Sequence, residues 1–208
     1  MKPMKLGFLA SGRGSNMQAV IDACRDGRLR ASPVLVISNN AGSMALERAA
    51  REHIPALHLS ARLFPDAEEL DRRITAALEQ YDVDLVILAG YMKKLGSGTL
   101  ARYAGRIINV HPALLPKFGG KGMYGDNIHR AVLAAGESET GVTIHLVEEQ
   151  YDSGPILAQR RVRVKPGDTV ETLRERVLAV EHELFVETVG AILQGKIKLP
   201  GKGTKGQD

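Results

Sequence analysis

The chain has 208 residues, of which 44% are hydrophobic and 25% are charged, a composition typical of a soluble globular domain with one core. No apolar run reaches the 18 residues of a membrane span, and the single cysteine, Cys24, excludes an intramolecular disulfide and fits a reducing, cytoplasmic location. The net charge of +4 lies mostly in residues 195–208, where four lysines stand against one aspartate, and only 4% of the residues are aromatic, which argues against nucleic-acid binding.

Short apolar runs and amphipathic stretches alternate over the first 110 residues. The apolar runs predict buried strands at 4–10, 33–38, 84–89 and 106–110, with a further short strand at 56–59. Apolar spacing predicts helices at 16–28, 43–53 and 66–81, the second capped by Ser43 and the third by Asp66. This alternation is typical of a parallel sheet covered by helices on both faces.

A glycine-rich turn, SGRGSN at residues 11–16, joins the first predicted strand to the first helix. Its glycines allow a tight turn with exposed N–H groups at a helix N-terminus, where an anion is stabilised. A dinucleotide fingerprint would need a third glycine at Met17 and an acidic residue after the second strand, and the Lys-Ser/Thr of a nucleoside-triphosphate loop is missing. One phosphate monoester fits best, although a plain turn in which Ser15 or Asn16 caps the helix would give the same pattern.

The strand predicted at 106–110 leads into Asn109-Val110-His111-Pro112. Side chains two positions apart on an extended chain point to the same face, so Asn109 and His111 can converge on one small volume. An amide donor beside a titratable donor suits the developing oxyanion of acyl transfer, whereas two satisfied polar residues at a strand end are the structural alternative. Ligands of open parallel sheets bind beyond the carboxyl ends of strands, which favours the functional interpretation.

After residue 140 the sequence predicts two strands, at 142–147 and 156–164, and a helix from 168 to about 193 capped by Asp168 or Thr169. Asp152 lies in the link between these strands, in a Tyr-Asp-Ser-Gly-Pro sequence that is also a common turn. With Asn109 and His111 it would complete a constellation of amide, imidazole and carboxylate that can move protons. Another histidine, His145, is expected to pack near this site rather than to react.

These elements predict the α/β class: a single domain with a mostly parallel twisted sheet, helices on both faces, and antiparallel strands toward the C-terminal part. No linker or internal repeat divides the chain, so the domain is expected to span residues 1–195. The Lys/Gly-rich residues 196–208 are expected to form a flexible tail. No His-x-x-x-His or Cys-x-x-Cys pair is present, and no metal is expected.

Three motifs in this order resemble the glycinamide ribonucleotide formyltransferases of purine biosynthesis: SGRGSN at 11–16, NVHPALLP at 109–116 and EEQYDSGPIL at 148–157. The resemblance covers nearly the whole chain and implies the Rossmann-like fold of folate-dependent formyltransferases. It implies that 10-formyltetrahydrofolate is the co-substrate and that the amine of glycinamide ribonucleotide accepts the formyl group. We expect a monomer or homodimer with no membrane or nucleic-acid partner.

The resemblance also implies a role for each matching residue. Asn109 and protonated His111 would stabilise the tetrahedral oxyanion, while Asp152 would support His111 and relay a proton through water to the leaving folate nitrogen. The phosphate and ribose of the substrate would contact Gly12, Arg13, Gly14, Ser15, Asn16 and Glu181. The folate would contact Leu88, Ala89, Gly90, Tyr91, Met92, Lys93, Lys94, Leu95, Glu148, Glu149, Gln150 and Tyr151. We add the hypothesis that Lys93 attracts the anionic glutamate tail of the folate.

Two segments depart from the family pattern. Many members have a shorter link after Leu-Leu-Pro, whereas residues 118–125 here contain four glycines, which suit either a mobile flap or an extended surface loop. Lys93-Lys94 replaces an arginine followed by an apolar residue, which leaves the folate contacts there open.

Other activities are weighed against this one. A methionyl-tRNA formyltransferase would need a further C-terminal RNA-binding domain and a formyltetrahydrofolate deformylase usually has an extra N-terminal domain, so the length disfavours both. A nucleotide-binding module without catalysis would explain the glycine loop but would leave Asn109, His111 and Asp152 as coincidence. A nicotinamide oxidoreductase lacks its fingerprint. A paralogue that formylates a related amino-sugar phosphate stays open.

Overall fold

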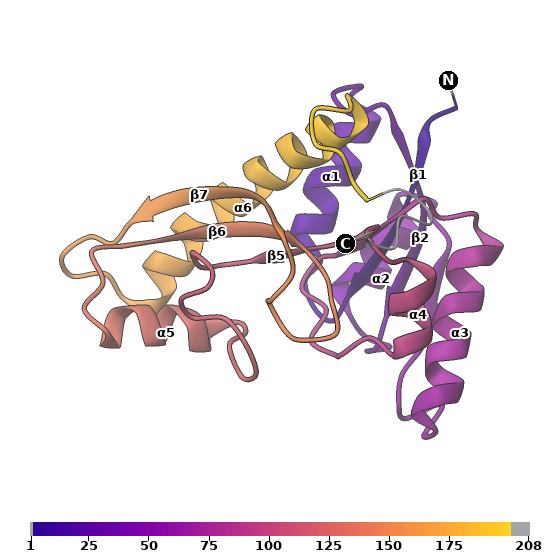
Figure 1. The fold of residues 1–208 in the computed structure, drawn as a ribbon, viewed down its shortest axis with the longest axis horizontal. Coiled ribbons are helices and arrows are strands. Elements are labelled where there is room, and N and C mark those ends of the chain that lie inside the picture. The colour runs from indigo at the N-terminus through magenta and orange to yellow at the C-terminus, as the bar shows by residue number, and fades with distance from the viewer. Residues whose placement is uncertain (1, 201–208) are drawn as a thin grey trace, which may run out of the picture.

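Seven strands form one sheet in the order β3-β2-β1-β4-β5-β6-β7 in the computed structural model, which describes residues 2–200 (Figure 1). β1 to β5 are parallel, and β6 and β7 pair antiparallel with β5 and with each other, which confirms the predicted class and sheet. The strands are β1 (Met4–Ala10), β2 (Ala31–Ser38), β3 (Ala56–His58), β4 (Leu85–Leu88), β5 (Ile107–His111), β6 (Glu139–Leu146) and β7 (Ile156–Arg163).

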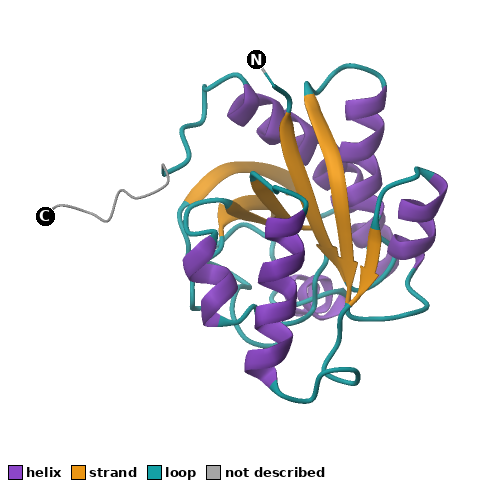
Figure 2. Ribbon diagram, turned by 90° about the vertical axis from the view of Figure 1, so that its right-hand side faces the viewer, coloured by secondary structure: helices purple, strands orange, loops and turns teal. Residues whose placement is uncertain are grey.

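Helices cover both faces of this sheet (Figure 2). They are α1 (Ser15–Arg25), α2 (Met44–Arg51), α3 (Ala67–Gln80), α4 (Ser97–Arg102), α5 (Asp126–Ala134) and α6 (Val170–Leu193). Three predicted caps are confirmed, because the side chains of Ser43, Asp66 and Thr169 accept hydrogen bonds from the first turns of α2, α3 and α6. Each cap fixes where its helix begins.

The continuous apolar strands are buried on both faces. In β1, Leu6, Phe8 and Ala10 belong to the larger core, which packs against α1, α2, α5 and α6. Leu9, between them in sequence, belongs to the second core, under α3 and α4. Because alternate side chains of a strand point to opposite faces, a strand buried on both sides reads as an unbroken apolar run.

Several elements differ from the sequence prediction, and three of the differences have a clear physical reason. α1 ends at Arg25 rather than at residue 28, because Gly27 adopts a left-handed φ of 83° that stops the helix. β2 begins at Ala31 and runs through Pro33, which is tolerated because β3 pairs only with residues 36–38 and leaves this part of β2 at an edge. α4 was not predicted, and its first turn is held by Asp71 of α3, whose Oδ2 accepts a hydrogen bond from the Gly98 N–H at 2.8 Å.

The C-terminal residues that the structure describes continue along the main core. Ile197 and Leu199 pack against that core as partly buried side chains. Residues 201–208, which make up most of the expected tail, lie outside the described part of the chain. Within residues 2–200, no helix combines the length and the apolar character that a membrane span requires.

Candidate active site

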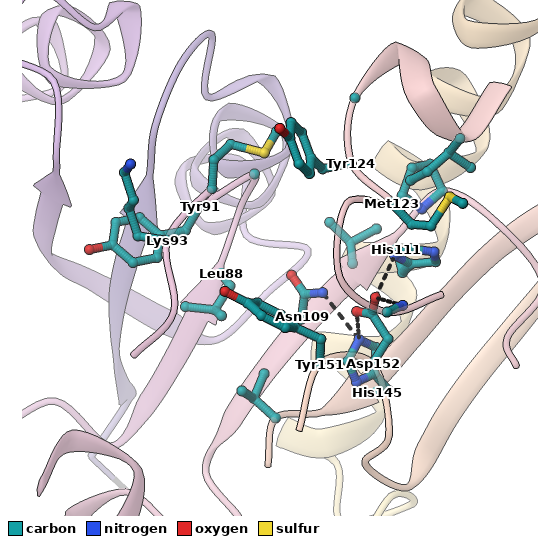
Figure 3. A pocket seen from close by; sticks show the side chains of 18 of the residues that line it. Leu88, Tyr91, Lys93, Asn109, His111, Met123, Tyr124, His145, Tyr151 and Asp152 are labelled. Atoms are coloured by element: carbon teal, nitrogen blue, oxygen red, sulfur yellow. Dashed lines mark hydrogen bonds and ion pairs between the residues drawn. The ribbon is translucent and has the colours of Figure 1, made fainter. Parts of the chain in front are cut away.

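A cavity of about 600 Å³ opens beyond the carboxyl ends of β4 and β5 (Figure 3). It shares several lining residues with a second cavity of about 440 Å³ at the glycine turn after β1. Gly12, Gly14 and Ala89 line only the smaller cavity, and all the other residues predicted for catalysis, phosphate, ribose or folate line the larger one. The fold therefore brings together side chains that are up to 168 positions apart in the sequence, from Arg13 to Glu181, as expected for the switch region of an open sheet.

Asn109, His111 and Asp152 meet at one end of the larger cavity. Asn109 and His111 lie on β5, and Asp152 reaches them from the loop between β6 and β7. Asp152 Oδ2 lies 3.6 Å from His111 Nδ1 and accepts a hydrogen bond from the Gly120 N–H at 2.8 Å. The three predicted side chains thus form one cluster, in which the carboxylate faces the imidazole.

His145 on β6 is directly opposite Asn109 in the antiparallel pairing, and its Nε2 is close to both Asn109 and Asp152 (Figure 3). Its Nδ1 is 2.8 Å from the Leu146 carbonyl oxygen, which can only accept, so this nitrogen donates. In the neutral ring Nε2 then accepts from Asn109 Nδ2 at 3.1 Å. An amide NH₂ carries two hydrogens, so Asn109 keeps a second donor. His145 packs at the site, as expected, and orients the amide.

The glycine turn has the geometry of an anion-binding helix start. Gly14 is the N-cap of α1 with a left-handed φ of 64°, and no side chain caps the helix. The capping alternative for Ser15 or Asn16 therefore does not describe this turn. A Cβ on Gly14 would lie 2.9 Å from Ala45 Cβ, so only glycine allows the starts of α1 and α2 to approach this closely. The uncapped N–H groups at the start of α1 suit a phosphate.

Glu181 on α6 is paired with Asn16 at the start of α1. Asn16 Nδ2 donates to Glu181 Oε2 at 2.5 Å, and both residues are buried. Burial raises the pKa of Glu181 to about 7, although the bond from Asn16 lowers it. Asn16 Oδ1 is buried with no partner among the described residues. A carboxyl group and a free acceptor beside an anion site are suited to the hydroxyls of a sugar phosphate.

A model of the formyl transferase family matches residues 4–189. The chain is 44% identical over 200 residues to the chloroplastic phosphoribosylglycinamide formyltransferase of Arabidopsis thaliana, covering 93% of this chain and 67% of that protein. It is 36% identical over 196 residues to phosphoribosylglycinamide formyltransferase of Escherichia coli (strain K12), covering 94% of this chain and 90% of that protein. The chain belongs to the phosphoribosylglycinamide formyltransferases.

The structural comparison agrees with this family. The crystal structure of glycinamide ribonucleotide transformylase 1 from Symbiobacterium toebii matches with a TM-score of 0.89 at 39% identity, covering 96% of this chain and 92% of that one. The chain also matches the bovine trifunctional purine biosynthetic protein adenosine-3 at 39% identity, but it spans only 20% of that protein. The similarity therefore concerns about a fifth of that protein.

The surroundings of His111 in this formyltransferase act on its pKa in opposite directions. His111 is 3% exposed, and its Nε2 donates to the Phe118 carbonyl oxygen at 2.8 Å. Burial lowers the pKa of His111 and outweighs Asp152 and Phe118, which raise it. For Asp152, burial raises the pKa, but His145, His111 and the Gly120 N–H together bring it below its usual value. The His111 imidazole therefore gives up its proton more readily than a free histidine, and the Asp152 carboxyl group ionises more readily than a free aspartate.

Several cavity residues were not found from the sequence. Arg174 on α6 binds Asp126 on α5 through Nη1 at 3.0 Å from Oδ1, and buried His129 lies on the same wall. Arg174, Leu178 and Glu181 are spaced by four and three positions, so they share one helix face. Given Glu181, this spacing could have indicated from the sequence that Arg174 and Leu178 also line the cavity. Within residues 2–200, no group of three or more His, Cys, Asp or Glu side chains is placed to hold a metal ion.

Proposed function

We propose that this formyltransferase moves the formyl group of 10-formyltetrahydrofolate to the amine of glycinamide ribonucleotide. The products are N-formylglycinamide ribonucleotide and tetrahydrofolate, a step of de novo purine biosynthesis. One observation carries the proposal: a single cavity joins the uncapped start of α1 to the cluster of Asn109, His111 and Asp152. A phosphate held at the first places an attached amine within reach of the second.

The reaction begins when the amine nitrogen attacks the formyl carbon and its electron pair forms the new C–N bond. The carbonyl oxygen becomes an oxyanion, which accepts a hydrogen bond from the free N–H of Asn109 and is stabilised by the positive charge of His111 once that ring is protonated. The bond from the formyl carbon to the folate nitrogen then breaks. Asp152, through water and His111, carries the proton from the attacking amine to that nitrogen, so charge and protons balance.

The two substrates bind to different walls of the cavity. The N–H groups of residues 12–16 hold the phosphate, with Arg13 beside it, and Glu181 and Asn16 hold the ribose hydroxyls. The folate lies along residues 88–95 and 148–151. Lys93 lies on the Tyr91 side of the cavity, away from His111, where it attracts the glutamate tail of the folate (Figure 3).

The decisive experiment is a spectrophotometric assay of folate absorbance with the purified protein. We expect formyl transfer that requires both substrates. Hydrolysis of 10-formyltetrahydrofolate without the ribonucleotide would favour a deformylase, and tight nucleotide binding without turnover would favour a binding module. A related amino-sugar phosphate, offered in place of the ribonucleotide, tests the paralogue alternative.

Further properties follow as proposals of the same function. We propose a catalytic domain at residues 1–195 with a tail at 196–208, a cytoplasmic location, and a monomer or homodimer that sedimentation would distinguish. The mechanism above uses only side chains and backbone groups, so dialysis against EDTA should leave the rate unchanged. Loss of activity that zinc or magnesium restores would contradict it.

A further inference from the structure

Residues 118–120 contribute backbone groups to the reacting end of the cavity. The Phe118 carbonyl oxygen accepts the hydrogen bond from His111 Nε2 at 2.8 Å. The Gly120 N–H donates to Asp152 Oδ2 at 2.8 Å, and the same oxygen faces His111 Nδ1 at 3.6 Å. The segment therefore contacts both members of the imidazole–carboxylate pair.

The backbone of this segment lies directly against Asp152. A Cβ on Gly119 would be 3.3 Å from Asp152 Cβ and 2.6 Å from Leu115 Cδ2. A larger residue at position 119 would therefore push this segment away from Asp152. Phe118 and Asp152 have φ values of 56° and 54°, and they are two of the four non-glycine residues with positive φ in the described part of the chain. Such conformations cost about 1–3 kcal/mol and persist only where the surroundings hold them. Here the two strained residues lie on either side of His111.

We propose that residues 118–120 position the His111–Asp152 pair for proton transfer. The Phe118 carbonyl keeps the proton of the neutral imidazole on Nε2, and the Gly120 N–H anchors the carboxylate opposite Nδ1. When Nδ1 takes up a proton from the attacking amine through water, both ring nitrogens donate to an oxygen, and the cation is stabilised until the proton leaves for the folate nitrogen. This inference rests on the proposed function and assigns the positioning to backbone groups of a glycine-rich segment.

The ionisation of Asp152 depends on few neighbours. Among the described residues, the titratable groups that face it are His111 from β5 and His145 from β6. The Gly120 N–H stabilises the charged carboxylate, so its loss should raise the pKa of Asp152. Because the proton relay needs Asp152 as a carboxylate, kcat falls at low pH as this group is protonated. With a raised pKa, this acidic limb of the profile of kcat against pH should move to higher pH.

Gly120 and Gly122 provide a matched pair of substitutions. Their φ values are 95° and 91°, and a Cβ at either position would meet no atom within 4 Å. Alanine keeps the backbone N–H, but it is strained at such a φ, so the local backbone shifts to relieve the strain at either position. Only at position 120 does this shift move an N–H away from Asp152. We expect Gly120→Ala to lower kcat about tenfold and to move the acidic limb up by about one pH unit, as loss of a hydrogen bond to a charged group predicts. Gly122→Ala should leave the limb where the wild type has it.

A second measurement needs no turnover. Nitrogen-15 spectra of the histidine rings, with the His111 signals assigned from a His111→Asn variant, report which ring nitrogen carries the proton. We expect the Nε2-protonated tautomer for His111 in the wild type. We expect a mixture of tautomers in Gly120→Ala, because the backbone shift that relieves the strain at position 120 also moves the Phe118 carbonyl, two residues earlier, away from Nε2. This result stands even if the protein shows no formyl transfer, so failure of the two proposals can be told apart. A wild-type Nδ1 tautomer, an unmoved limb in Gly120→Ala, or equal shifts in both glycine variants would overturn the inference.

Discussion

Gly14 and Gly120 stand in the two glycine-rich segments that border the cavity, and they are glycines for different physical reasons. At Gly14 the reason is space as well as φ, because a Cβ would lie 2.9 Å from Ala45 Cβ. At Gly120 there is open space for a Cβ, and only the φ of 95° requires glycine. The first segment is fixed by bonds from α2, whereas the second is fixed by His111 and Asp152.

This difference separates two regions of the molecule. The anion end is folded from consecutive residues 11–16 and is held by structural contacts of α1 and α2. The reacting end is assembled from β5, β6, the loop that follows β6, and the segment at 118–120. We therefore expect changes at the reacting end to act on kcat, and changes at the anion end to act on stability or on KM for the ribonucleotide.

The largest effect is expected for Asn109→Ala at the reacting end. The alanine removes the donor for the oxyanion, and the rate should fall roughly 100- to 1,000-fold, as for other oxyanion donors. KM for both substrates should change little, because the oxyanion exists only in the transition state. Steady-state kinetics with both substrates test this.

The control for Asn109→Ala is a thermal unfolding curve. The substitution also removes the partner of His145 Nε2, so the variant must first be shown to fold as the wild type does. If kcat then matched the wild type, Asn109 would have no part in stabilising the oxyanion.

The sequence was most informative where geometry is local. Asn109 and His111 share a face because a strand repeats every two residues, and residues 11–16 follow a strand and open a helix. The continuous apolar strands and the caps Ser43, Asp66 and Thr169 are likewise local signals. These signals sufficed for the fold class and for the edge of the sheet at which the cavity opens.

Contacts between distant segments could not be predicted in the same way. His145 orients Asn109 only because β5 and β6 pair in one particular register, which no local pattern specifies. The Arg174–Asp126 bond joins two helices, and α4 depends on Asp71 from α3. The contacts of Phe118 and Gly120 involve backbone groups, which every residue has.

Glu181→Gln tests the electrostatics of the anion end. The folded protein binds the Glu181 proton more tightly than the unfolded chain, because burial raises the pKa from 4.5 to about 7. Wild-type stability should therefore fall by about 3 kcal/mol as the pH rises through this window. Glutamine does not titrate and can still accept the bond from Asn16, so this loss should disappear. Urea unfolding at pH 5 and pH 8 measures the loss of stability, and Glu183→Gln, a change at an exposed residue of the same helix, is the control. Equal pH dependence in the wild type and both variants would refute the raised pKa of Glu181.

Gly14→Ala tests the packing at the same end. The added methyl group meets Ala45 and occupies a left-handed φ, so the free energy of unfolding should fall by about 1–3 kcal/mol. Gly12→Ala is the matched control, because a Cβ there meets no atom within 4 Å, and its effect should stay within about 0.5 kcal/mol. Urea unfolding of both variants gives the comparison. Equal losses would mean that the close approach of α1 and α2 does not require glycine.

The smallest effect is expected for Lys93→Ala, on the wall that the larger cavity shares with the smaller cavity at the glycine turn. Lys93 is exposed, so its attraction for the folate glutamate is weakened by water and screened by salt. KM for the folate should rise about threefold at low ionic strength and return to the wild-type value at about 0.5 M salt, with kcat unchanged. Lys165→Ala, an exposed lysine outside the cavity, controls for net charge. A KM effect that salt leaves intact would assign Lys93 a direct contact, and an effect on kcat would mean that the binding wall and the reacting end do not act separately.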